Sequence, residues 1–201
     1  MNCQMNKQRS LAHRSPRNSS IPLSVEFHWE EKPMEGEGTC AYQDGTAYSG
    51  FFKSGRFQGD GTFTWPDGSR YTGRWDNDLP HQRGTILLSD GYRYEGEWQS
   101  GVAEGKGTET LPDGGKYTGQ WKNGMKNGYG EMIFPDGKKY KGGWKDGLMH
   151  GKGVLSFTDG SRYEGEWEEN RISGRGSLIF WDGKVYEGEW KDNKFSVLDV
   201  V

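Results

Sequence analysis

The sequence lacks several features that define common protein classes. No apolar run is long enough to cross a bilayer as a helix, and the N-terminus has no hydrophobic segment of the kind found in secretory signals. The two cysteines, Cys3 and Cys40, are too few for a disulfide framework in a chain of 201 residues. No segment shows the apolar spacing of an amphipathic helix. These absences favour a soluble, cytoplasmic, helix-free protein.

The chain is also poor in aliphatic side chains. Hydrophobic residues make up only 31% of it, which is too little for a thick β-sandwich or barrel core, whereas glycine accounts for 33 residues and tryptophan for 9. The glycines have no period of three, which excludes a collagen helix. We therefore expect tight turns and a core built from aromatic rings.

One pattern of 23 residues recurs along most of the chain and is most complete at 140–162. Counted from Tyr140 as offset 0, glycine stands at +2, +7, +11, +13 and +20, tryptophan at +4 and aspartate at +19. Repetition at a fixed period of this size is typical of arrays whose neighbouring copies share a core. Full copies follow one another without insertion or deletion from Tyr48, Tyr71, Tyr94, Tyr117, Tyr140 and Tyr163.

The copies divide the chain into an arm and an array. Residues 1–24 hold four basic and no acidic residues and have no periodic apolar pattern, which predicts a disordered basic arm. A degenerate copy spans 25–47, six full copies span 48–185, and a partial capping copy spans 186–201. Since the whole chain carries −3, the array carries −7, which argues against a body that wraps nucleic acid.

The offsets predict two antiparallel strands per copy. Strand side chains alternate between two faces, so offsets 0, +2 and +4 share one face and present Tyr, Gly and Trp. We call this the ring face and the opposite one the polar face. Glycine at +11 and +13 lets rings of the adjacent strand lie over bare backbone. Gly, Asn or Asp at +7 predicts a left-handed turn, and Asp-Gly at +19 and +20 predicts a second turn.

The pattern Tyr-x-Gly-x-Trp-x-x-Gly-x-x-x-Gly-x-Gly, continued to Asp-Gly, closely resembles the MORN (membrane occupation and recognition nexus) repeat. The resemblance covers 25–201. It implies an all-β, single-layer antiparallel solenoid in the form of an elongated twisted rod, made of repeats alone. Members of this family act as scaffolds and adaptors in cytoskeletal, ciliary, flagellar and membrane-contact structures.

No spacing indicates a catalytic or metal site. His81 and His150 share offset +10 but stand three copies apart, and Asp76-x-Asp78 lacks the rest of a calcium loop. Gly-x-Gly recurs in register with the copies, which makes it architecture rather than a phosphate-binding loop. We expect a protein that is not an enzyme and uses no cofactor.

The ring face is the candidate binding surface. Its rings form the core first of all, but a single layer has no second sheet to cover them, which leaves an apolar groove for a helix or an extended peptide as the alternative. Specificity is expected where copies depart from the pattern, at Phe51, His81, Gln82 and Glu109. The candidate groove residues are Tyr94, Trp98, Tyr117, Trp121, Tyr140, Trp144, Tyr163 and Trp167, bordered by Phe57, Met149 and Ile172.

Two functions follow as hypotheses. The first is a scaffold or adaptor that binds a protein partner in a cytoskeletal assembly, most naturally a cilium or flagellum. The alternative is a membrane-associated module for anionic lipid such as a phosphoinositide, against which the −7 charge argues. Glutamates such as Glu164 and Glu166 form either a solvated face or a docking stripe for a basic segment. The stretch from Phe195 to Val201 either caps the array or lets the terminal strand pair with a second copy.

Overall fold

The computed structural model describes residues 2–5 and 34–196 and divides the chain into two compact units, residues 1–109 and 110–201. We call them the N-terminal unit and the C-terminal unit. The boundary falls inside the copy that begins at Tyr94, where the repeat pattern predicts no break. The described residues form strands and turns without a helix, so none of them makes a helix able to span a membrane.

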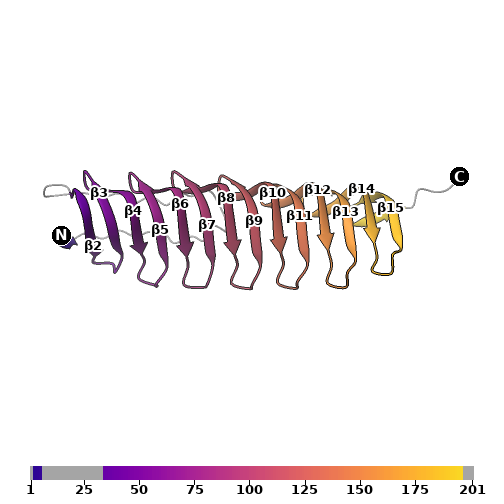
Figure 1. The fold of residues 1–201 in the computed structure, drawn as a ribbon, viewed down its shortest axis with the longest axis horizontal. Coiled ribbons are helices and arrows are strands. Elements are labelled where there is room, and N and C mark those ends of the chain that lie inside the picture. Colours follow the sequence, from indigo (N-terminus) through magenta and orange to yellow (C-terminus); the bar gives the residue numbers. More distant parts are fainter. Residues whose placement is uncertain (1, 6–33, 197–201) are drawn as a thin grey trace. The chain divides into compact units, whose positions relative to one another are not determined.

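Within each unit, neighbouring strands lie side by side in the order of the chain (Figure 1). Each full copy contributes two strands, one of seven and one of nine residues, joined by a two-residue turn. The strands of the N-terminal unit are β1 (Asn2–Met5), β2 (Gly36–Tyr42), β3 (Ala47–Lys53), β4 (Arg56–Thr64), β5 (Arg70–Asp76), β6 (Leu79–Leu87), β7 (Arg93–Gln99) and β8 (Val102–Thr110).

The C-terminal unit repeats the same arrangement. From β2 to β7 and from β9 to β16 every neighbouring pair is antiparallel, which confirms the predicted all-β, single-layer antiparallel sheet in each unit. The strands of the C-terminal unit are β9 (Lys116–Lys122), β10 (Met125–Ile133), β11 (Lys139–Lys145), β12 (Leu148–Ser156), β13 (Arg162–Glu168), β14 (Arg171–Ile179), β15 (Val185–Lys191) and β16 (Lys194–Ser196).

The N-terminal arm differs from the prediction at its start. Residues 1–24 are predicted to be disordered throughout, whereas Asn2–Met5 form β1, which pairs in parallel with Thr39–Tyr42 of β2. Residues 6–33, which include the rest of the arm and the start of the degenerate copy, lie outside the described residues, as do 197–201 of the capping copy. A backbone pairing across more than 30 residues of sequence has no local signature, which is why the pattern does not predict it.

The turn inside each copy has two residues with positive φ. In the copy that begins at Tyr140 these are Asp146, with φ of 49°, and Gly147, with φ of 84°. Two successive positive φ values define the type I′ turn, whose twist matches that of the flanking strands. The left-handed turn conformation predicted at +7 is confirmed in the seven copies that begin at Tyr48 or later. Positive φ at +6 falls on Asn or Asp in four copies, residue types that tolerate it, but also on Ser54, Ser100 and Glu169, which give no such signal.

The two glycines of the second strand serve different purposes. Gly151 at +11 has a φ of 71° and lies at an irregularity in the pairing of β11 with β12, as expected for a bulge glycine. Gly153 at +13 allows close contact, because an added Cβ would lie 2.4 Å from the hydroxyl oxygen of Tyr140. The predicted ring-over-backbone packing is therefore found at +13, whereas +11 is set by backbone conformation.

Candidate functional site

The tyrosines and tryptophans of the ring face form a continuous buried ladder within each unit. Tyr140 is 0% exposed and Trp144 is 7% exposed. The Tyr140 ring lies 5.3 Å from Trp144 of its own copy and 5.2 Å from Trp167 of the next, edge to face in both contacts. Tyr71, Tyr117 and Tyr163 are held between two tryptophans in the same way, a geometry that favours the ring quadrupoles.

The polar atoms of the ladder bond to backbone carbonyls. The Tyr140 hydroxyl donates to the carbonyl oxygen of Gly143 at 3.0 Å, and Trp144 Nε1 donates to that of Gly130 at 3.3 Å. The same two bonds recur elsewhere, for example from Tyr163 to Glu166 and from Trp167 to Gly153. Burial raises the pKa of the Tyr163 hydroxyl to about 12 and raises the pKa of Tyr140 as well, so both remain neutral donors.

These contacts place most of the candidate groove residues in the core. The eight tyrosines and tryptophans are at most 7% exposed, and Phe57 is 0% exposed and stacked on Tyr48 with ring centroids 3.7 Å apart. Only Met149 and Ile172 of the candidate groove residues are half-buried. A partner on the ring face would therefore meet the layer above the rings rather than the rings themselves.

That outer layer comes from offsets +9, +15 and +17 and is accessible in the C-terminal unit. Residue +9 pairs in register with the tryptophan of its copy, as Met149 does with Trp144, and residue +15 pairs with the tyrosine, as Leu155 does with Tyr140. Of this outer layer, the predicted groove includes only +9 residues, Phe57, Met149 and Ile172; the apolar residues that recur at +15 and +17 are the signal that could have identified the rest. The half-buried apolar residues at these offsets are Leu111, Phe134, Met149, Leu155, Phe157, Ile172, Leu178 and Phe180.

One cation lies within this layer. Lys126 occupies +9 in the copy that begins at Tyr117, where other copies have Phe57, Met149 or Ile172. Its ammonium lies 5.3 Å from the ring centroid of Tyr117 and 5.8 Å from that of Trp144. Contacts of this kind stabilise a cation over an aromatic face, so the array accommodates a charged residue at +9.

The four departures from the pattern have different environments. Phe51 is 41% exposed on the polar face, and His81 is half-buried on the same face. Gln82 is exposed and has a φ of 56°, so it adopts the bulge conformation that glycine adopts at +11 in other copies. Glu109 is buried on the ring face, where its Oε1 accepts a hydrogen bond from the Tyr92 hydroxyl at 3.0 Å. Their role in specificity stays a prediction.

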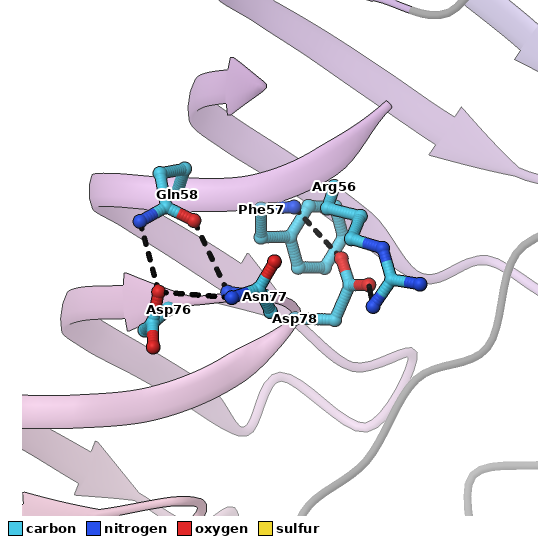
Figure 2. Close-up of polar contacts among 6 residues, drawn as sticks. All are labelled: Arg56, Phe57, Gln58, Asp76, Asn77 and Asp78. Atoms are coloured by element: carbon cyan, nitrogen blue, oxygen red, sulfur yellow. Dashed lines mark hydrogen bonds and ion pairs between the residues drawn. The ribbon is translucent and has the colours of Figure 1, made fainter. Parts of the chain in front are cut away.

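Asp78 is a buried carboxylate at a turn of the N-terminal unit (Figure 2). Its Oδ1 accepts a hydrogen bond from the Phe57 backbone N–H at 2.7 Å, and its Oδ2 lies 3.9 Å from the Arg56 guanidinium. Burial raises the pKa of Asp78 to about 6, against the opposing effects of this hydrogen bond and of Arg56. Beside it, Asp76 accepts hydrogen bonds from Gln58 and Asn77, so both carboxylates of the Asp76-x-Asp78 motif join neighbouring copies.

Several glutamates of the polar face are paired with arginines. Glu164 is paired with Arg162, and Glu189 is paired with Arg175 at 3.0 Å. Within residues 2–5 and 34–196, no three His, Cys, Asp or Glu side chains converge in a way that could hold a metal ion.

Comparison with solved structures finds weak likenesses. The SAS-4 (dCPAP) TCP domain of Drosophila melanogaster, solved in complex with a proline-rich motif of Ana2 (dSTIL), shares 12% identity over 91% of this chain and 99% of its own, with a TM-score of 0.48. The TCP10 domain of Danio rerio CPAP shares 18% identity over 76% and 83% of the two chains, with a TM-score of 0.33. These likenesses are too weak to assign a function or a partner.

Comparison at the level of sequence identifies the repeats. A search of curated proteins finds no match. The MORN repeat profile matches eight times, at 28–47, 48–70, 71–91, 94–116, 117–139, 140–162, 163–185 and 186–198. The matched copies begin at the same tyrosines that the 23-residue period identifies from Tyr48 onward. They account for nearly all of residues 28–198, and the chain therefore belongs to the MORN repeat family.

Proposed function

We propose that this chain is a non-enzymatic scaffold or adaptor that binds a protein partner on the ring face of its C-terminal unit. The observation that carries the proposal is the half-exposed apolar layer formed there by Met149, Leu155, Ile172 and Leu178 above the Tyr/Trp ladder. An apolar surface on a rigid support is the usual seat of an apolar peptide or helix face.

The spacing of the layer suits a regular partner. Each copy contributes two strands, so equivalent residues of successive copies such as Met149 and Ile172 are about 9–10 Å apart across the sheet. A helix advances about 10.5 Å in seven residues. An extended peptide in the polyproline II conformation advances about 9.3 Å in three residues, which returns to the same face. A partner with an apolar residue at either interval would place successive side chains against successive copies. The cytoskeletal setting, in a cilium or flagellum, rests on the family resemblance.

The experiment compares substitutions that the array itself accommodates. Ile172→Lys follows Lys126, and Leu155→Glu follows Glu109, which occupy the same offsets in other copies. Val154→Glu, on the polar face, is the matched control and follows Glu131. Affinity purification with quantitative mass spectrometry should lose a common set of proteins with Ile172→Lys and with Leu155→Glu and keep it with Val154→Glu. Circular dichroism checks that each variant is folded.

Two results would count against the proposal. If folded Ile172→Lys and Leu155→Glu variants retain every protein bound by the wild type, the ring face is not the binding site. If the chain floats with phosphoinositide-containing vesicles at physiological salt, and the polar-face substitution Val154→Glu reduces flotation, the lipid alternative is favoured instead.

A further inference from the structure

The polar face of β9, β10, β11 and β12 is basic, although the array as a whole carries −7. These four strands are neighbours within the C-terminal unit (Figure 1). Their polar face has one acidic residue, the half-buried Glu131, against six exposed lysines. We call the lysines and the surface between them the lysine patch. They are Lys116, Lys122, Lys139, Lys141, Lys145 and Lys152.

The lysine patch lacks the glutamates that neutralise basic side chains in other copies. At the start of the copy that begins at Tyr163, Glu164 at offset +1 is paired with Arg162 two residues earlier. In the patch, offset +1 is Thr118 or Lys141, so the lysines two residues earlier have no such glutamate beside them. None of the six lysines forms an ion pair with another residue of 34–196. Their charge is therefore open to an anionic partner.

Exposed apolar groups lie among the lysines. Tyr129 is 56% exposed at offset +12, where every other full copy has a charged residue. It pairs with Gly143, which has no side chain to cover the ring. Met125 is 38% exposed and Leu148 is 36% exposed, and each lies directly opposite a lysine of the patch, so it shares the face of that lysine. The patch therefore combines positive charge with apolar contact surface.

The lysines have the spacing of an extended chain. Lys139 and Lys141 are two residues apart in β11, which sets them about 6.8 Å apart along the strand. An extended peptide repeats the side chains of one face at the same interval. From Lys139 to Lys145 the patch is about 20 Å long, and its outer strands are about 14 Å apart. An extended segment of about six residues would cover its length.

The patch is bounded by acidic side chains on the side of β13. Lys152 lies opposite Glu166, and Val154 lies opposite Glu164, in the pairing of β12 with β13. A bilayer surface or a nucleic acid carries negative charge over a wider area than the patch, so either would also approach these glutamates. A short segment can contact the lysines without that repulsion. The charge pattern therefore favours an acidic peptide segment over the other two classes of anion.

We propose that the lysine patch binds an acidic segment of a partner protein, with carboxylates at alternate residues facing the lysines and an apolar side chain against Tyr129. Contacts between lysine and carboxylate are charge-assisted hydrogen bonds, and attraction between opposite charges speeds association and weakens with salt. The patch and the apolar layer of the ring face lie on opposite faces of the sheet, because Lys141 and Tyr140 are consecutive in β11. Binding at the patch is therefore independent of binding at the ring face.

The test measures binding of a short fluorescein-labelled peptide of alternating Glu and Thr to the full chain by fluorescence anisotropy. Lys141→Glu and Lys145→Glu introduce the residue types of Glu164 and Glu168 at the same offsets, so the array accommodates them. Together they should weaken binding by about tenfold or more, because each replaces an attraction by a repulsion. Lys191→Glu, in β15 at the same offset as Lys145, is the matched control and should leave the affinity unchanged.

Three results would overturn the proposal. The first is a double variant, shown to be folded by circular dichroism, that binds the peptide as tightly as the wild type. The second is equal binding of a peptide in which Gln replaces Glu, since charge would then not be the cause. The third is stronger, lysine-dependent binding of oligouridylate or of phosphatidylserine vesicles, which would assign the patch to a nucleic acid or to a membrane.

A second comparison tests the role of Tyr129. Tyr129→Lys introduces the residue type of Lys152 at the same offset. Exchanging a central Glu of the peptide for Leu should weaken binding to this variant more than binding to the wild type, because only the wild type offers the Leu side chain an exposed ring. Equal weakening in both proteins would show that Tyr129 does not contact the segment and would overturn that part of the proposal.

Discussion

The ring faces of the two units share an inner layer and differ in an outer one. In both units the tyrosines that begin the six full copies, from Tyr48 to Tyr163, are at most 1% exposed, and the tryptophans at +4 from Trp75 to Trp167 are 4–7% exposed. At +9, the N-terminal unit buries Phe57, Pro80 and Ala103, whereas the C-terminal unit leaves Lys126, Met149 and Ile172 half-buried. At +17, Trp65 and Leu88 are buried, whereas Phe134, Phe157 and Phe180 are half-buried.

This difference separates the residues that build the repeat from the residues that remain accessible to a partner. The tyrosines and tryptophans that define the repeat are buried in the full copies, and their polar atoms bond to backbone carbonyls, so they present little surface to a partner. The residues free to vary are at +9, +15 and +17, and their exposure distinguishes one unit from the other. Matched substitutions in the two units test this separation directly.

The largest loss of unfolding free energy is expected where the tyrosines of the inner layer lie closest to glycine backbone. Gly153→Ala in the C-terminal unit would place a Cβ 2.4 Å from the Tyr140 hydroxyl oxygen, and Gly61→Ala in the N-terminal unit would place one 2.2 Å from that of Tyr48. Each should cost about 3 kcal/mol of unfolding free energy, measured by urea denaturation. Lys152→Ala, at an exposed neighbouring residue, is the control. A cost in one unit only would show that the inner layers differ.

A smaller effect, a gain rather than a loss of unfolding free energy, is expected from a substitution at Asp78. Because its folded pKa of about 6 is above the ordinary value, its contribution to stability is present below about pH 4 and is lost as the pH rises to about 6. Asp78→Asn keeps the acceptor for the Phe57 N–H, as Asn170 does for Met149, and removes the buried charge. It should raise the unfolding free energy at pH 7 by about 2 kcal/mol and leave it nearly unchanged at pH 4.

The matched control for Asp78 lies in the other unit. Asn170→Asp introduces a carboxylate at the same offset but at an exposed site. Urea denaturation of this variant between pH 4 and 7 should follow the wild type. A similar pH dependence at both sites would contradict burial as the cause of the raised pKa.

Removing one ladder hydrogen bond should cost less. Trp144→Phe and Trp75→Phe keep a ring, as Phe52 does at the same offset, but lose the Nε1 bonds to Gly130 and Gly61. Each should lower the unfolding free energy by about 1 kcal/mol. Partner binding by Trp144→Phe should be unchanged, whereas a loss of binding in a folded variant would mean that the inner layer contacts the partner.

The smallest effect is expected on the polar face. Arg162→Ala and Arg93→Ala each remove an exposed pair with a glutamate two residues later, Glu164 and Glu95. Each should change the unfolding free energy by less than about 0.5 kcal/mol, and the difference should vanish in high salt. An effect above about 1 kcal/mol in either unit would show that the polar face contributes to the fold.

Much of the fold could be predicted from the residues because each offset has its own physical requirement. Tyr140, Trp144 and Gly153 are placed on one face by alternation alone, and Gly147 predicts its turn through positive φ. The pairing of β1 with β2 could not be predicted, because it joins distant residues without a local signal. Nor could the positive φ of Ser54 and Glu169, which the flanking strands impose on ordinary residues.

The candidate site was harder to predict than the fold. The sequence places Tyr140 and Met149 on the same face, but it does not determine which of them remains accessible once neighbouring copies pack. Burial depends on residues one copy away, such as Trp167 over Tyr140. The same holds for Asp78, whose residue type is that of an exposed turn although its carboxylate is buried against Phe57.

The turn-to-turn contacts imply that the copies are not interchangeable. The +7 residue of one copy donates its backbone N–H to the carbonyl oxygen of the +9 residue in the copy before, as Asn193 does to Ile172. Where the +7 residue is Asp or Asn, its side-chain oxygen can also accept a hydrogen bond from the N–H of that +9 residue, as Asn193 does from Ile172. Pro80 has no N–H to donate, and the copy that follows it has Gly101, without a side chain. Placing the copy of Asn193 after Pro80 would leave its side-chain oxygen without the N–H that Ile172 donates, so the order of these modules is itself part of what the sequence encodes.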